Sequence, residues 1–178
     1  PYEKRSSMAI DLRAALEQAT VVARRAGEIL RADLHRRGGP RGGGDKADAD
    51  TEAEQLIRGR LLGAFRGWGF LGEETGYVPA RPGEPLWIVD PNDGTRDYLK
   101  GRRGSAVSIA LLVDEVPRLG VVFAFASPDD RGDLFAWADG CGPALRDGRP
   151  VAPLPRRVLG PLDVVLVSSA AESNPTGN

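Results

Sequence analysis

The chain has 178 residues, of which 41% are hydrophobic and 28% are charged, a balance typical of one globular domain or slightly more. Its 24 basic and 25 acidic residues nearly cancel, so the sequence lacks the basic character expected of a protein that binds nucleic acid polymers. One cysteine, Cys141, cannot form an internal disulfide, and the sequence shows neither a membrane-spanning apolar run nor a signal peptide. We therefore expect a cytoplasmic protein without membrane contact.

The first part of the chain predicts two helices. Residues 1–7 share no periodicity with the residues after them, and we set them aside as a candidate cloning remnant. From Ile10 to about Leu34, apolar residues recur every three or four positions, which is the period of an amphipathic helix. The glycine-rich segment 38–44 predicts a flexible surface loop, and apolar residues on one face of 53–65 predict a second helix. Its first turns carry the negative charge that a helix dipole favours, from Asp48, Asp50, Glu52 and Glu54.

Beyond Gly67 the pattern changes to short runs of aliphatic and β-branched residues, which predict strands. In chain order the expected strands cover residues 70–71, 86–89, 106–113, 118–126, 134–138, 144–151 and 164–167. Asp114-Glu115 and Asp147-Gly148 supply turn signals that predict hairpins, so most neighbouring strands should be antiparallel. The expected fold class is therefore α+β, with helices packed on a mostly antiparallel sheet.

The most informative segment runs from Trp87 to Thr95, with the sequence Trp-Ile-Val-Asp-Pro-Asn-Asp-Gly-Thr. It is typical of a buried strand that ends in a carboxylate, Asp90, and enters a turn at Pro91, so that Asp93 returns to the side of Asp90. Two carboxylates that converge at a strand end repel each other unless a cation lies between them. Ligands that are all oxygen select hard ions such as Mg²⁺.

Further polar groups are expected near this strand end. Gly94 and Thr95 open a short helical segment whose amides would face an anion, as helix starts do when they bind phosphate. Glu73 and Glu74 come after another predicted strand, and Asp50 adds a carboxylate from the second helix. The sequence therefore predicts adjoining metal and phosphate sites.

The segment Gly-Glu-Glu at 72–74, together with the nine residues at 87–95, resembles the inositol monophosphatase family of Mg²⁺-dependent, lithium-sensitive phosphatases. The order of later elements extends the resemblance over roughly residues 10–170. It implies the N-terminal, metal-binding α+β domain of that fold over residues 8–160. Residues 161–178 would then begin a C-terminal α/β domain that is largely absent.

The resemblance also implies ligands for two or three Mg²⁺ ions. Glu73 and Asp90 would hold the first ion together with the backbone carbonyl of Asn92. Asp90 and Asp93 would hold the second, and Glu74 would support the metal shell less directly. The plain alternative for the aspartates is a strand-end turn in which they bond their own backbone.

The same resemblance implies groups for catalysis and for phosphate binding. Thr95, hydrogen-bonded to Asp50, would orient the attacking water, with Asp50 as the base-side partner. The amides of Gly94 and Thr95, beside Asp93, would receive the phosphate. Asp50 and Thr95 could instead serve only as a helix-start charge and a capping hydroxyl.

The function implied is Mg²⁺-dependent hydrolysis of a small phosphate monoester by a metal-activated water. The expected substrate is an inositol phosphate or a related sugar or alcohol phosphate, with 3'-phosphoadenosine phosphate or histidinol phosphate as alternatives. A hypothesis from another class is an incomplete fragment or subunit that binds metal and phosphate but needs a second chain. Family analogy further implies a homodimer, or association with the chain's own C-terminal half.

The sequence departs from the family pattern at three points. Asn92 stands where the family usually has Ile or Leu, but the role implied for it uses only its carbonyl. Ala47 replaces a common Thr at the start of the second helix, and the Trp-Asp motif of the C-terminal domain is missing. Arg102 and Arg103 could form a solvated turn or help a phosphate to approach.

Overall fold

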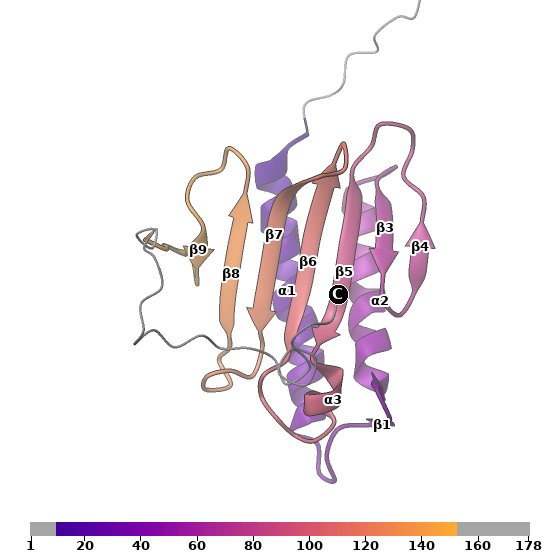
Figure 1. Ribbon diagram of the computed structural model, residues 1–178, viewed down its shortest axis with the longest axis vertical. Helices are drawn as coiled ribbons and strands as arrows, with labels where there is room; N and C mark the ends of the chain where they lie inside the picture. Colours follow the sequence, from indigo (N-terminus) through magenta and orange to yellow (C-terminus); the bar gives the residue numbers. More distant parts are fainter. Residues whose placement is uncertain (1–9, 153–178) are drawn as a thin grey trace, which may run out of the picture.

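The computed structural model describes residues 10–152, which form an eight-stranded sheet with two long helices on one face (Figure 1). The helices are α1 (Leu12–Leu34), α2 (Asp48–Ala64) and the short α3 (Thr95–Tyr98). The strands of the large sheet are β3 (Gly69–Gly72), β4 (Gly76–Val78), β5 (Leu86–Asp93), β6 (Ala106–Val113), β7 (Val116–Ala124), β8 (Asp133–Ala138), β9 (Leu145–Arg146) and β10 (Arg149–Pro150). A separate two-stranded pair consists of β1 (Gly42–Gly43) and β2 (Lys46–Ala47).

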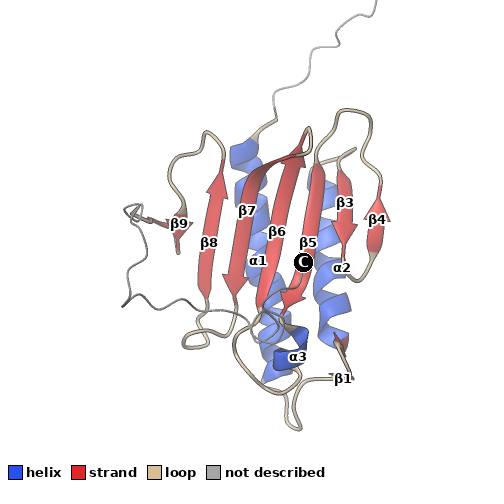
Figure 2. Cartoon of the chain, in the orientation of Figure 1, coloured by secondary structure: helices blue, strands red, loops and turns tan. Residues whose placement is uncertain are grey.

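The strand order across the large sheet is β10-β9-β8-β7-β6-β5-β3-β4. Every neighbouring pair is antiparallel except β3 and β5, which run parallel. Figure 2 shows the strands as one layer and both long helices behind it. The predicted α+β class with a mostly antiparallel sheet is therefore confirmed.

The core lies between the helices and the sheet. Alternate residues of the central strands, such as Ile109 and Val121, point toward the helices and are fully buried. Helix α1 covers β6, β7 and β8, whereas α2 covers β3 and β5. The opposite face of the sheet carries partly exposed apolar side chains, among them Val122, Phe135 and Trp137. No helix within residues 10–152 has both the length and the apolar character needed to cross a membrane.

Several expected elements differ in detail from those observed. The predicted loop 38–44 contains β1, which pairs with β2, and the sequence gives no sign of the edge strand β4. Strand β5 does not end at 89 but continues to Asp93. The expected strand 164–167 and the expected domain boundary at 160 lie outside the described residues, so both stay predictions.

Candidate functional site

The end of β5 contains a β-bulge, not the predicted tight turn. Asp90 pairs with Ser108 and Asp93 with Ala106, so three steps along β5 match two steps along β6. Pro91 lies inside the bulge, where its missing N–H costs no ladder hydrogen bond. Residues three apart in a regular strand point to opposite faces, but the extra residue brings Asp90 and Asp93 back to the same side. The predicted convergence of these two aspartates is therefore present, through a bulge.

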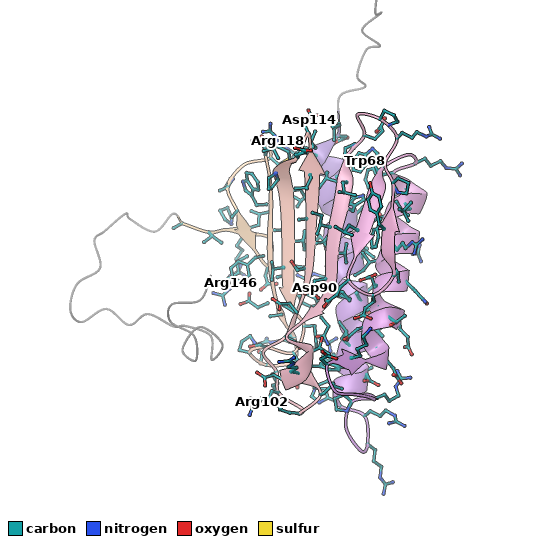
Figure 3. The ribbon with its side chains drawn as sticks, turned by 45° about the vertical axis from the view of Figure 1, so that its right-hand side comes forward. Trp68, Asp90, Arg102, Asp114, Arg118 and Arg146 are labelled. Atoms are coloured by element: carbon teal, nitrogen blue, oxygen red, sulfur yellow. The ribbon has the colours of Figure 1, made fainter. Side chains whose placement is uncertain are left out.

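The parallel pair β3 and β5 adds Glu73 to this strand end. Gly72 is the register partner of Val89, so the next residues along, Glu73 and Asp90, lie side by side. The Glu73 amide donates a hydrogen bond to the Val89 carbonyl oxygen at 3.3 Å. Asp90 lies toward the lower end of the sheet in Figure 3, far from Trp68 and Asp114 at the upper end. The carboxyl ends of β3 and β5 thus carry Glu73, Asp90 and Asp93.

These carboxylates are close enough to disturb one another. Burial is the largest cause that raises the pKa of Asp90 to about 6, and the negative charges of Glu73 and Asp93 raise it further. A hydrogen bond of 2.9 Å from the backbone N–H of Asn92 to Asp90 Oδ1 opposes that rise in pKa. The charges of Glu73 and Asp93 are thus a smaller cause of the raised pKa than burial, and they are the part that a bound cation would offset.

Asp50 lies in the first turn of α2, is 2% exposed, and is the best-connected carboxylate of the site. Its Oδ1 accepts a hydrogen bond from Asn92 Nδ2 at 2.8 Å, and its Oδ2 accepts one from the Ala47 amide at 3.3 Å. Thr95 Oγ1 lies 3.1 Å from Asp50 Oδ2 and 2.9 Å from the Asn92 carbonyl oxygen, and it can donate to one of them at a time. Burial raises the pKa of Asp50 above its ordinary value, although these hydrogen bonds lower it.

The Asp50–Thr95 pair implied by the resemblance is thus present as a contact. The part played by the Asn92 side chain is not among the sequence predictions, which gave a role only to its backbone carbonyl. The N-cap residue of α2 is Ala47, which has no capping oxygen, and Asp50 compensates in part by accepting the Ala47 amide.

A second buried carboxylate on α2 is absent from the sequence predictions. Glu54 is fully buried and accepts hydrogen bonds from the amides of Glu74 at 3.0 Å and Thr75 at 2.5 Å. The helix dipole alone accounts for an acidic start of α2, so it gave no reason to single out Glu54. The spacing of four residues from Asp50, which places both side chains on one helix face, was the available signal.

Gly94 connects the bulge to α3 with a left-handed backbone, φ 101°, which favours glycine. A Cβ at this position would lie 3.3 Å from Ser105 Cβ, so the space is also tight. The first amides of α3 have no acceptor within their own helix, as at any helix start. The predicted role of the Gly94 and Thr95 amides in binding phosphate stays a prediction.

Arg102 and Arg103, for which the sequence left two roles open, form ion pairs at the surface. Arg102 lies 2.7 Å from Asp97, and Arg103 lies 3.1 Å from Asp130. All four side chains are at least 40% exposed. This arrangement favours the solvated-turn interpretation of Arg102 and Arg103 over a role in phosphate approach.

The carboxylates at this strand end are of the right chemical type to bind a hard cation, but their side chains are not arranged as a complete metal site. Glu73, Asp90 and Asp93 offer only oxygen atoms, which suits Mg²⁺. Asn92 Oδ1 is buried and accepts no hydrogen bond from the part of the chain that the structure describes. Within residues 10–152, however, no three His, Cys, Asp or Glu side chains are spaced as the ligands of one ion. The residues fit the ion as donors, and their side chains would have to move to complete a site.

Two surface hollows lie away from this strand end. One of about 390 Å³ is lined by Arg24, Arg131 and Arg146 with neighbouring aspartates. Another, of about 480 Å³, is lined by Tyr77 and Leu112 beside the turn between β6 and β7. Neither hollow includes a predicted site residue.

Comparison with known proteins places this chain in a family. Residues 11–172 match the model of the inositol monophosphatase family. The chain is 34% identical over 139 residues to inositol monophosphatase 1 of Solanum lycopersicum, a match that covers 75% of this chain and 49% of that protein. It is 38% identical over 104 residues to a histidinol-phosphatase of Chlorobaculum parvum, covering 58% of this chain and 38% of that protein.

A solved structure of similar fold supports the same family. The inositol monophosphatase of Anabaena (Nostoc) sp. PCC 7120 superposes with a TM-score of 0.66 at 31% identity, over 80% of this chain and 50% of that one. The chain therefore spans about half the length of such relatives. With the family model matched over residues 11–172, the chain belongs to the inositol monophosphatase family.

Proposed function

We propose that this chain supplies the metal- and phosphate-binding part of a phosphatase that hydrolyses small phosphate monoesters. The observation that carries the proposal is the convergence of Glu73, Asp90 and Asp93 at the ends of β3 and β5, beside the buried Asp50–Thr95 contact. Family membership supports the reaction class, and the oxygen-only donor set supports Mg²⁺ as the metal.

In this proposal Glu73, Asp90, Asp93 and the carbonyl of Asn92 would hold two or three Mg²⁺ ions, and Glu74 would support them. The ions would supply positive charge that stabilises the phosphate oxygens and lowers the pKa of water. The ions would neutralise the negative charges of Glu73 and Asp93, which add to burial in raising the pKa of Asp90.

Asp50 and Thr95 would accept the proton that the attacking water loses. The Thr95 hydroxyl, 3.1 Å from Asp50 Oδ2, can donate to that carboxylate while its oxygen accepts a proton from an attacking water. Burial raises the pKa of Asp50, which makes it a better proton acceptor than an exposed aspartate. The amides of Gly94 and Thr95, next to Asp93, would bind the phosphate oxygens.

The substrate class in this proposal is broad. Relatives include proteins named inositol monophosphatase and histidinol-phosphatase, so we propose an inositol phosphate or a related small sugar or alcohol phosphate. Histidinol phosphate and 3'-phosphoadenosine phosphate are the alternatives. The hollows lined by Arg24 and by Tyr77 contain none of the predicted site residues, so neither of them favours one of these esters.

A second candidate is a part that binds metal and phosphate but turns over substrate only with another polypeptide. The observation that favours it is the coverage of about half of each relative. Association with the remaining half of the fold, or formation of a homodimer, would then be required for activity.

The test is Mg²⁺-dependent phosphate release from a panel of inositol, sugar, histidinol and nucleotide phosphates, together with Mn²⁺ binding as a probe of the metal site. Asp90→Asn should abolish both. Asp114→Asn is the matched control, because Asp114 lies in the turn after β6 at φ 51°, a conformation that asparagine adopts readily. Mn²⁺ binding without phosphate release would favour the second candidate, and equal Mn²⁺ binding by wild type and Asp90→Asn would overturn the proposed function.

A further inference from the structure

Glu54 is an unusual carboxylate for its place in the sequence. It lies in the first half of α2, where an acidic side chain would ordinarily face water, yet it is fully buried. Burying a carboxylate is costly unless hydrogen bonds replace its water. The partners that replace water here are two backbone amides, those of Glu74 at 3.0 Å and Thr75 at 2.5 Å.

The two amides belong to the turn of residues 73–75, which comes directly after β3 and contains Glu73. This turn is also fastened from α2 by Arg58, whose Nη1 donates to the Thr75 carbonyl oxygen at 3.2 Å. On its other side the Glu73 amide bonds the Val89 carbonyl oxygen of β5. The turn is therefore held between α2 and β5, with Glu54 accepting hydrogen bonds from its last two amides.

Gly72 shows how closely Glu54 approaches this turn. A Cβ added at Gly72 would lie 2.1 Å from Glu54 Oε1 and 2.4 Å from its Cδ. Any side chain at position 72 would displace the carboxylate. The Gly-Glu-Glu segment thus leaves room for Glu54 at the glycine that precedes Glu73.

Asp50 and Glu54 lie one helical turn apart on the same face of α2. Asp50 binds Asn92 near the end of β5 and Thr95 just after it, and Glu54 binds the turn after β3. One helix face therefore determines the relative position of the two segments that carry Glu73 and Asp90. We propose that Glu54 is a positioning residue, which orients the turn of residues 73–75 so that Glu73 faces Asp90 as a metal ligand. This inference rests on the proposed function.

The test compares Mn²⁺ affinity in wild type and Glu54→Gln. Glutamine has the same shape, but its amide group offers one acceptor, so it leaves one of the two backbone N–H groups facing another donor. We expect Mn²⁺ affinity to fall about 10- to 100-fold, as when outer partners of metal ligands are changed. Glu54→Asp retains the charge on a side chain one methylene shorter, and it should not restore the affinity. Glu17→Gln, at an exposed position of α1, is the control and should bind Mn²⁺ as wild type does.

The outcomes separate three cases. A folded Glu54→Gln protein that melts earlier but binds Mn²⁺ with wild-type affinity would show a merely structural role and overturn the inference alone. Equal Mn²⁺ binding by wild type and Asp90→Asn would overturn the proposed function, and the inference with it. If Glu54→Gln does not fold, Arg58→Met tests the same turn without disturbing the buried carboxylate. We expect a several-fold loss of Mn²⁺ affinity in that variant, and unchanged affinity would overturn the inference.

Discussion

The side-chain amide of Asn92 donates a 2.8 Å hydrogen bond to Asp50 Oδ1, which joins the end of β5 to the first turn of α2. Asn92 is 1% exposed and Asp50 is 2% exposed, so water cannot replace this bond. The Thr95 hydroxyl lies within hydrogen-bond distance of Oδ2, the other oxygen of the same carboxylate. The position of Asp50 therefore depends on two residues of the segment that also carries Asp90 and Asp93.

Asn92→Leu should destabilise the protein by about 1–3 kcal/mol, because it leaves Asp50 Oδ1 buried without its donor. Urea unfolding at neutral pH measures the loss. Asn92→Asp should lower stability further, because it places a second carboxylate against Asp50. A leucine variant as stable as wild type would show that the Asn92–Asp50 bond contributes nothing net.

Thr95→Val should lower the rate of phosphate release while leaving the fold intact. Valine matches threonine in shape but lacks the hydroxyl that lies 3.1 Å from Asp50. If this hydroxyl handles the proton as proposed, kcat should fall by about 100-fold or more at saturating Mg²⁺. Thr95→Ser keeps a hydroxyl and should retain most of the activity. Equal kcat in the valine and wild-type proteins would exclude Thr95 from proton transfer.

Periodicity predicts most of the fold because it reports local patterns. The apolar spacing of α1 and the aliphatic runs of β6 and β7 extend over many residues, and their predicted ends lie within about two positions of the observed ones. The edge strand β4 has three residues and β1 has two, which is too short for any period to appear. Pro91 favours a turn in the sequence, whereas β6 holds β5 in the sheet through a bulge. Long-range pairing decides that detail.

The candidate site is predictable where one segment carries it. Asp90, Asp93 and Thr95 lie within six residues of one another, and the resemblance names their partner Asp50. Glu54 is not found from the sequence, because its burial depends on the close approach of Gly72 from β3. That contact joins residues distant in sequence, and the only local sign of it is the spacing of four residues that places Glu54 on the same helix face as Asp50.

Acid should weaken the packing of α1 through Asp33, which is 6% exposed. Burial alone would raise its pKa, but hydrogen bonds from Arg41 Nε at 2.6 Å and from the Arg41 amide, with Tyr98, hold the pKa below the ordinary 3.8. A carboxylate with a lowered pKa stabilises the fold above its unfolded pKa, and this contribution disappears as the pH falls through the folded pKa.

Asp33→Asn should therefore cost about 1–3 kcal/mol near neutral pH and progressively less below about pH 4. Urea unfolding of both proteins across that pH range measures the difference. A difference in stability that stays constant with pH would show that the charge of Asp33 is not what stabilises the fold.

The packing of α1 on β7 should tolerate no side chain at Gly27. A Cβ there would lie 2.5 Å from Phe123 Cε1 and 2.7 Å from Phe125 Cβ, so alanine must push the helix away from the sheet. Overpacking costs about 1–3 kcal/mol, more than the roughly 1 kcal/mol that alanine gains over glycine in a helix. Thermal unfolding should therefore show Gly27→Ala to be less stable than wild type.

The control is Gly59, inside α2, where an added Cβ meets no atom within 4 Å, so Gly59→Ala should be more stable by about 0.5–1 kcal/mol. A Gly27→Ala protein at least as stable as wild type would refute the close packing described for α1.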